Sequence, residues 1–139
     1  TLFPYTTLFR SSNLVKGGDS DCLELFTELV TCNEASATTY PIGTVLGKIT
    51  AGGKYIRSVR TAVDGSQTAA AVVIADGFGV YDTVTIPATT DTKVLVLARG
   101  KQKLAKNALS LDASYSTTPQ KQAAYDALKA LGLLVVDQA

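Results

Sequence analysis

The sequence contains no histidine, tryptophan or methionine, and only two of its 139 residues are cysteines. Without histidine, no side chain has an unperturbed pKa near neutrality. A general base would have to be a carboxylate, lysine, cysteine or tyrosine with a strongly shifted pKa. That requirement counts against an enzyme. Two thiols are also too few for a zinc site, and we expect no metal, no cofactor and no small-molecule substrate.

Long apolar runs and charge clusters are missing as well. No apolar run approaches the ~20 residues of a membrane-spanning helix, so we expect no membrane segment. The chain has 13 basic and 12 acidic residues, a net charge of +1. The densest basic stretch holds Arg99, Lys101, Lys103 and Lys106 without interleaved aromatic residues, which favours a solvated loop over a phosphate-binding strip. We therefore expect no nucleic-acid partner.

The length fits one domain, but its N-terminal part is unusual. Thr1–Ser11 reads TLFPYTTLFRS, which resembles the translation of a common short-read sequencing adapter. We expect this stretch not to be native, to contribute nothing to stability, and to mark a gene whose true start is missing. Without Arg10 the basic count falls to 12 and equals the acidic count. Residues 12–37 are expected to form a partly flexible N-terminal arm or strand, and residues 38–139 the main β domain.

The two cysteines, Cys22 and Cys32, leave two alternatives open. They could pair, but reduced thiols are the simpler interpretation in a chain without a convincing signal peptide. The run between them is ambiguous too. Leu29 and Thr31 share the apolar face of a period-two pattern, while a helical face is also possible, and the β-branched end of the run favours a strand.

Short apolar runs separated by glycine turns predict a mostly β domain. Pro41–Thr50 is a turn that opens into a strand, and a hairpin connection at residues 51–54 leads to a half-exposed strand at Tyr55–Arg60. Ala69–Ala75 is apolar without interruption, as in a strand buried on both faces, so Val72 and Ile74 should be core residues. Further strands are expected at residues 84–86, ended by Pro87, and at residues 94–97 and 133–136.

One helix is expected near the C-terminus, over about residues 119–131. Thr118 can cap it, Pro119 fits its first turn, and Gly132 supplies a left-handed exit. Ala124, Leu128 and Leu131 fall on one face. Six or so strands and one late helix argue against alternating βαβ units.

Motifs that would carry chemistry have simpler structural interpretations, and we predict no catalytic residue. Gly43, Gly47 and Lys48 lack the spacing of a phosphate-binding loop and fit a hairpin. Asp64 and Asp76 stand beside glycines, where aspartate forms turns. A Ser–Lys dyad stays open because three lysines neighbour strands, and dispersed tyrosines could stack sugars or lie at the edge of a core. The lysines are Lys48, Lys54 and Lys93; the tyrosines are Tyr40, Tyr55, Tyr81, Tyr115 and Tyr125.

An ordered series of segments resembles the bacteriophage head decoration proteins of the lambda type. Pro41–Thr50 is similar to that family's "aG-T-V-L-G-k" strand, and Asp64–Ile74 to its "D-G-s-x-t-A-x-g-V-L" segment. Val94–Gly100 resembles a late strand, and Ala130–Val135 the family's close after the helix. Ala71 departs from the pattern, since many relatives have glycine there. The order and spacing agree over about a hundred residues, and the series is specific where single motifs are not.

The resemblance implies a small, partly open barrel of the β-clip kind with one C-terminal helix. It also implies a structural protein that binds as homotrimers at the three-fold and quasi-three-fold sites of an expanded icosahedral head. Its partners would be itself and the phage major capsid protein. Its place would be the outer surface of the virion, after assembly in the host cytoplasm. We expect the family's capsid-touching arm to be incomplete here.

Two other functions are kept as alternatives. One is a different phage structural or carbohydrate-adhesion β module, suggested by threonine-rich strands and dispersed tyrosines. The other is a hydrolase with a Ser–Lys or carboxylate site.

Overall fold

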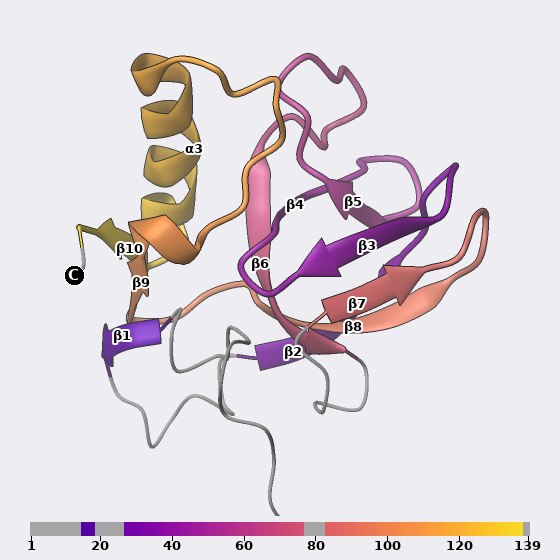
Figure 1. Cartoon of the computed structure of the whole chain (residues 1–139), viewed down its shortest axis with the longest axis horizontal. Coiled ribbons are helices and arrows are strands. Elements are labelled where there is room, and N and C mark those ends of the chain that lie inside the picture. The colour runs from indigo at the N-terminus through magenta and orange to yellow at the C-terminus, as the bar shows by residue number, and fades with distance from the viewer. Residues whose placement is uncertain (1–14, 19–26, 77–82, 138–139) are drawn as a thin grey trace, which may run out of the picture.

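A closed barrel of five strands forms the centre of the molecule (Figure 1). The computed structural model describes residues 15–18, 27–76 and 83–137. Around the barrel the strand order is β2-β5-β4-β6-β8. The bounds of these strands are Thr27–Cys32 for β2, Val45–Lys48 for β4, Tyr55–Arg57 for β5, Ala69–Asp76 for β6 and Thr92–Leu97 for β8.

The barrel closes where β2 meets β5. These strands are parallel and share a single residue pair, Cys32 with Tyr55, and the Asn33 N–H donates to the Tyr55 carbonyl oxygen at 3.3 Å. The β4–β5 hairpin makes this contact possible because its turn places Tyr55 opposite Lys48 at the end of β4. The partly open barrel of the sequence analysis is therefore corrected to a closed one. One long-range strand pair closes the ring, and no local sequence signal reports such a contact.

Two hydrophobic cores lie on the two sides of the barrel wall. The interior core fills the barrel, and the outer core lies between the outer face of the barrel and the C-terminal helix. Strand β6 separates them, since Ala71 and Val73 point into the interior core while Val72 and Ile74 point into the outer one. This confirms that the apolar run of β6 is buried on both faces.

The outer core is covered by the helix α3 (Thr118–Ala130) and by two strands, β9 and β10, of a three-stranded sheet in the order β1-β9-β10. Figure 1 shows these elements together on one side of the barrel. The strands are β1 (Val15–Gly18), β9 (Gln102–Ala105) and β10 (Leu133–Val136), and a short 3-10 turn, η2 (Lys106–Ala108), follows β9.

This part of the fold corrects one prediction. The middle of the basic stretch forms strand β9 instead of a loop, because Gln102, Leu104 and Ala105 are buried while Lys101 and Lys103 stay in solvent. Strand β10 then pairs with β9 in parallel, so β9, α3 and β10 form one β-α-β crossover, and over the described residues the fold is mostly β, as predicted, without alternating units of this kind. Leu104, Leu128 and Leu133 hold this crossover together in the outer core.

The ends of α3 follow local signals. The N-cap is Thr117, one residue before the predicted Thr118, and Gln120 Oε1 accepts the backbone N–H groups of Ser116 (2.9 Å) and Thr117 (3.2 Å). Ala124 and Leu128 are buried and Leu131 is half-buried, which confirms the predicted apolar face. The predicted left-handed exit is confirmed by Gly132.

Strand β2 confirms the preference for a strand but reverses its faces. Val30 and Cys32 point into the interior core, whereas Leu29 is 53% exposed. The period-two pattern had placed Leu29 and Thr31 on the apolar face. The register of β2 against its neighbours decides which face is buried, because a shift of one residue moves every side chain of a strand to the other face.

A two-stranded ribbon made of β3 (Thr38–Pro41) and β7 (Thr83–Ile86) packs against the interior core from the side opposite the helix (Figure 1). Tyr40, Val84 and Ile86 are buried in that core, while Thr39 and Thr85 face solvent. The predicted strand at residues 84–86 is confirmed, with Pro87 directly after its end.

Candidate interaction surfaces

The glycines and aspartate that suggested chemistry in the sequence have packing and turn roles. A Cβ atom on Gly47 would lie 2.0 Å from the Ser66 carbonyl oxygen, so glycine permits a close approach of two backbones. Asp64 Oδ1 accepts the Ser66 N–H (3.0 Å) and Ser66 Oγ–H (2.5 Å), which lower the pKa of Asp64. The turn interpretation of Asp64 is confirmed. The side chain of Asp76 lies outside the described residues.

The tyrosines do not form an exposed stacking platform in the part of the chain that the structure describes. Tyr40, Tyr55 and Tyr115 are buried and Tyr125 is half-buried, while Tyr81 lies outside the described residues. The carbohydrate-adhesion alternative thereby loses its main structural support. The prediction that tyrosines lie at the edge of a core holds for these positions.

A surface hollow of about 420 Å³ brings together the three lysines that the sequence analysis singled out. It lies at one end of the barrel, between β2, the β4–β5 turn and the start of β8. We call it the lysine hollow. Its lining residues are Glu28, Leu29, Val30, Thr31, Lys48, Gly52, Gly53, Lys54, Tyr55, Asp91 and Lys93.

Each ammonium group in the lysine hollow has a defined neighbour. Lys93 Nζ donates to Thr31 Oγ1 at 2.8 Å, Lys54 Nζ pairs with Asp91 Oδ1 at 2.7 Å, and Lys48 Nζ lies 5.9 Å from the centre of the Tyr55 ring. A hydrogen bond from Lys54 and a smaller effect of a hydrogen bond from Asn33 lower the pKa of Asp91 and keep its carboxylate ionised. Within the described ranges no serine bonds to these lysines, so they form no Ser–Lys dyad there.

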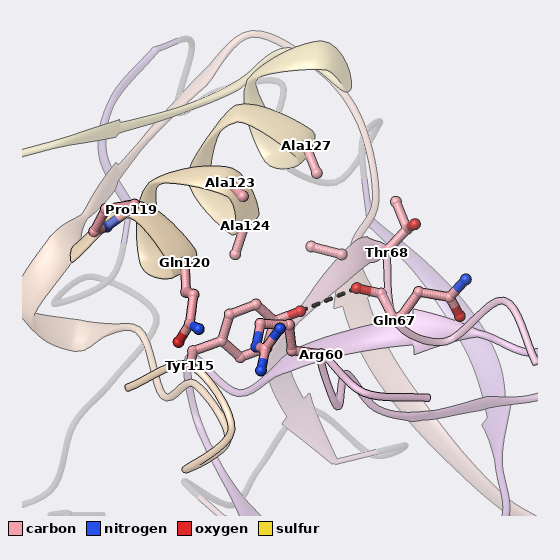
Figure 2. Close-up of a pocket in the computed structure, with 10 residues that line it drawn as sticks. Arg60, Gln67, Thr68, Tyr115, Pro119, Gln120, Ala123, Ala124 and Ala127 are labelled. Atoms are coloured by element: carbon pink, nitrogen blue, oxygen red, sulfur yellow. Dashed lines mark hydrogen bonds between the residues drawn. The ribbon is translucent and has the colours of Figure 1, made fainter. Parts of the chain in front are cut away.

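A second surface cleft, of about 430 Å³, lies between α3 and the connection from β5 to β6 (Figure 2). We call it the helix groove. Its floor and walls are mostly small and apolar, with Arg60 and Gln67 on the side away from the helix. The lining residues are Arg60, Gln67, Thr68, Ala69, Tyr115, Pro119, Gln120, Ala123, Ala124 and Ala127.

Buried hydroxyl groups hold the helix groove in shape. Ser58 Oγ and Tyr115 Oη lie 3.0 Å apart, next to the carbonyl oxygens of Ser66 (2.9 Å) and Gln67 (3.0 Å). Nearby, Arg60 Nε donates to the Ser114 carbonyl oxygen at 3.0 Å. These contacts join the connection between β5 and β6 to the segment that precedes α3.

A partly buried polar cluster lies where the chain passes from β2 to β3. Glu34 Oε1 accepts hydrogen bonds from the Tyr40 hydroxyl and, at 3.1 Å, from the Arg57 N–H. Burial, and secondarily the charge of Glu34, raise the pKa of Cys32 to about 12. The Cys32 thiol is thus free, buried and protonated at neutral pH. Cys22, its possible disulfide partner, lies outside the described residues.

Neither metal nor membrane chemistry is indicated by the described residues. They contain no group of three or more His, Cys, Asp or Glu side chains arranged to hold a metal ion. Over the same ranges, no helix has the length and apolar character needed to cross a bilayer.

The sequence analysis singled out the three lysines of the lysine hollow but did not connect Leu29 or Asp91 with them. Only the barrel brings these segments together.

The fold defines a class: a small β-barrel domain supported by one C-terminal helix, with the lysine hollow and the helix groove on its surface. The family model for bacteriophage lambda head decoration protein D matches residues 26–133, and the chain belongs to this family. The family suggested by the ordered motifs is thereby confirmed. It is a family of structural proteins of the phage capsid. A search of curated proteins found no match to the chain.

Proposed function

We propose that the protein binds as a homotrimer at the three-fold and quasi-three-fold positions of an expanded icosahedral phage head. There it contacts the major capsid protein from the outer surface, after assembly in the host cytoplasm, and it has no catalytic centre. The observation that carries this proposal is the family match, which spans all five barrel strands, α3 and the first residue of β10. The domain that the family shares is therefore the folded barrel itself.

The physical basis is linkage between binding and shell stability. A protein that binds the intact expanded shell better than its disassembled subunits stabilises that shell by mass action. A trimer that touches several shell subunits at once also gains from multivalency, so weak individual contacts suffice. A closed barrel with two cores suits this role because it presents its surfaces without large rearrangement.

The test is a binding experiment with expanded phage heads that lack their decoration protein. Purified protein should sediment as a trimer, co-sediment with the heads to saturation, and raise the temperature at which the heads release their DNA. Heads before expansion serve as the control and should bind less. A strictly monomeric protein that leaves expanded heads unbound and no more stable would contradict the proposal.

A further inference from the structure

The lysine hollow carries more positive charge than its own carboxylates neutralise. It contains three lysines and two carboxylates, Glu28 and Asp91. Of the ion pairs formed among the described residues, only Lys54 with Asp91 involves this hollow. Lys48 and Lys93 therefore keep their charges available to a partner.

These cations are already held in position. Thr31 accepts a hydrogen bond from Lys93 at 2.8 Å, and the Tyr55 ring lies beneath Lys48. A lysine side chain normally loses much rotamer freedom on binding, and part of that entropic cost is already met here. The hollow is thus prepared for carboxylates that approach from solvent.

Leu29 adds an apolar contact to the same hollow. It is 53% exposed, and β2 places it two residues before Thr31 on the same face. Thr31 pairs with Lys93 across β2 and β8 and accepts a hydrogen bond from its ammonium group, and the backbone of Leu29 lies about 7 Å from that of Thr31 along the strand. An extended chain repeats its side chains on one face at the same two-residue interval.

We propose that the lysine hollow is the docking site for an extended acidic segment of another protein, with an apolar side chain on Leu29 and carboxylates at Lys48 and Lys93. Resting on the proposed function, we assign this segment to the phage shell protein. Charge complementarity favours such a partner. The exposed Leu29 favours a protein segment over a nucleic-acid backbone or an anionic lipid surface, because neither of those partners requires this apolar contact.

The test compares three forms of the full chain: wild type, Lys48→Glu with Lys93→Glu, and a control with Lys121→Glu and Lys103→Glu. All four lysines are exposed, so both variants change the net charge equally. Circular dichroism and thermal melting check their folds, and Lys48→Gln with Lys93→Gln replaces the first variant if it does not fold. Affinity for undecorated expanded heads is then measured at low and physiological salt.

We expect the hollow variant to bind heads about tenfold or more weakly than wild type at low salt, and added salt should no longer weaken its binding, because the reversed charges repel an acidic segment; the control should bind like wild type. Equal binding of all forms, or equal loss in both variants, would overturn the docking site but leave the proposed function intact. A wild type that ignores heads would overturn both. Wild-type binding to duplex DNA or phosphatidylserine vesicles that depends on Lys48 and Lys93 would overturn the choice of a protein segment.

Discussion

At the residue scale, the fold depends on side chains that the barrel wall distributes between two cores. Ile74 belongs to the outer core and Val73, its neighbour, to the interior one. Both lie in β6, which pairs with β4 on one side and β8 on the other. A substitution in this strand therefore disturbs a region without room to relax.

We predict that Ile74→Asp prevents folding. Ile74 is 5% exposed, and the new carboxylate would be buried among apolar side chains without a partner. Circular dichroism and hydrogen-exchange NMR of the purified variant measure the outcome. Ile74→Val is the matched control and should fold with a loss of about 0.5–1.5 kcal/mol. A soluble Ile74→Asp protein of normal stability would show that the placement of this residue is wrong.

The buried thiol of Cys32 predicts a loss of stability at alkaline pH. Its pKa is raised from 9.0 to about 12, so the folded state holds the proton that the unfolded state releases. The stabilisation is fully present below about pH 9 and falls as pH rises toward the folded pKa. Burial also raises the pKa of Tyr40 and Tyr55, which extends the decline.

Urea unfolding at about pH 7 and about pH 10.5 measures this effect in wild type and in Cys32→Ala, since stability must follow the difference in bound protons. The variant should be less stable overall, yet lose less stability between the two pH values. The same pH-dependent loss in both proteins would show that the Cys32 thiol is not the cause of the alkaline loss of stability.

At the scale of elements, the transition from α3 to β10 depends on one backbone geometry. Gly132 has a φ of +92°, and a Cβ atom there would lie 2.1 Å from the Gly100 carbonyl oxygen. The turn therefore needs glycine both for its left-handed backbone and for the close approach of another turn. It places Leu133 directly into the outer core.

We predict that Gly132→Ala lowers the free energy of unfolding by more than about 2 kcal/mol, from backbone strain and a steric clash together. Gly52→Ala is the matched control, because Gly52 has a φ of +93° but its Cβ would meet nothing within 4 Å. The control should lose only about 1 kcal/mol, from strain alone. Urea titrations of both variants measure the difference, and equal losses would exclude the close approach as a cause.

At the scale of the whole molecule, the two cores share three barrel strands. Strands β4, β6 and β8 contribute side chains to both cores, whereas the β3–β7 ribbon contributes only to the interior one. The helix and the β9–β10 pair depend on the outer core alone. Stability should therefore be highest along β6 and β8 and lower toward the covering elements.

Native-state hydrogen exchange measures this distribution. We predict the slowest amide exchange in β6 and β8, at residues such as Val72 and Val96, and clearly faster exchange in β3 and β7. The reason is that exposing a strand shared by two cores requires both to open, while the ribbon can detach from one. Equal protection of the ribbon and β6 would contradict the division of the molecule into two cores.

Local chemistry determined much of this protein directly from the sequence. The apolar run of β6, the hairpin before Tyr55 and the glycine after α3 follow from patterns that act within a few residues, and the structure confirms them. The order of these segments also indicated the family, since order and spacing survive when single motifs are unspecific.

Only the tertiary structure decided which strands meet and which faces turn inward. The barrel closure at Cys32 and Tyr55, the exposed side of β2 with Leu29, and the parallel pairing of β9 with β10 all depend on contacts between distant segments. The same holds for the lysine hollow, where residues from β2, the β4–β5 turn and β8 converge. A period-two pattern states that a strand has two faces, but burial of one face depends on the register that its neighbours impose.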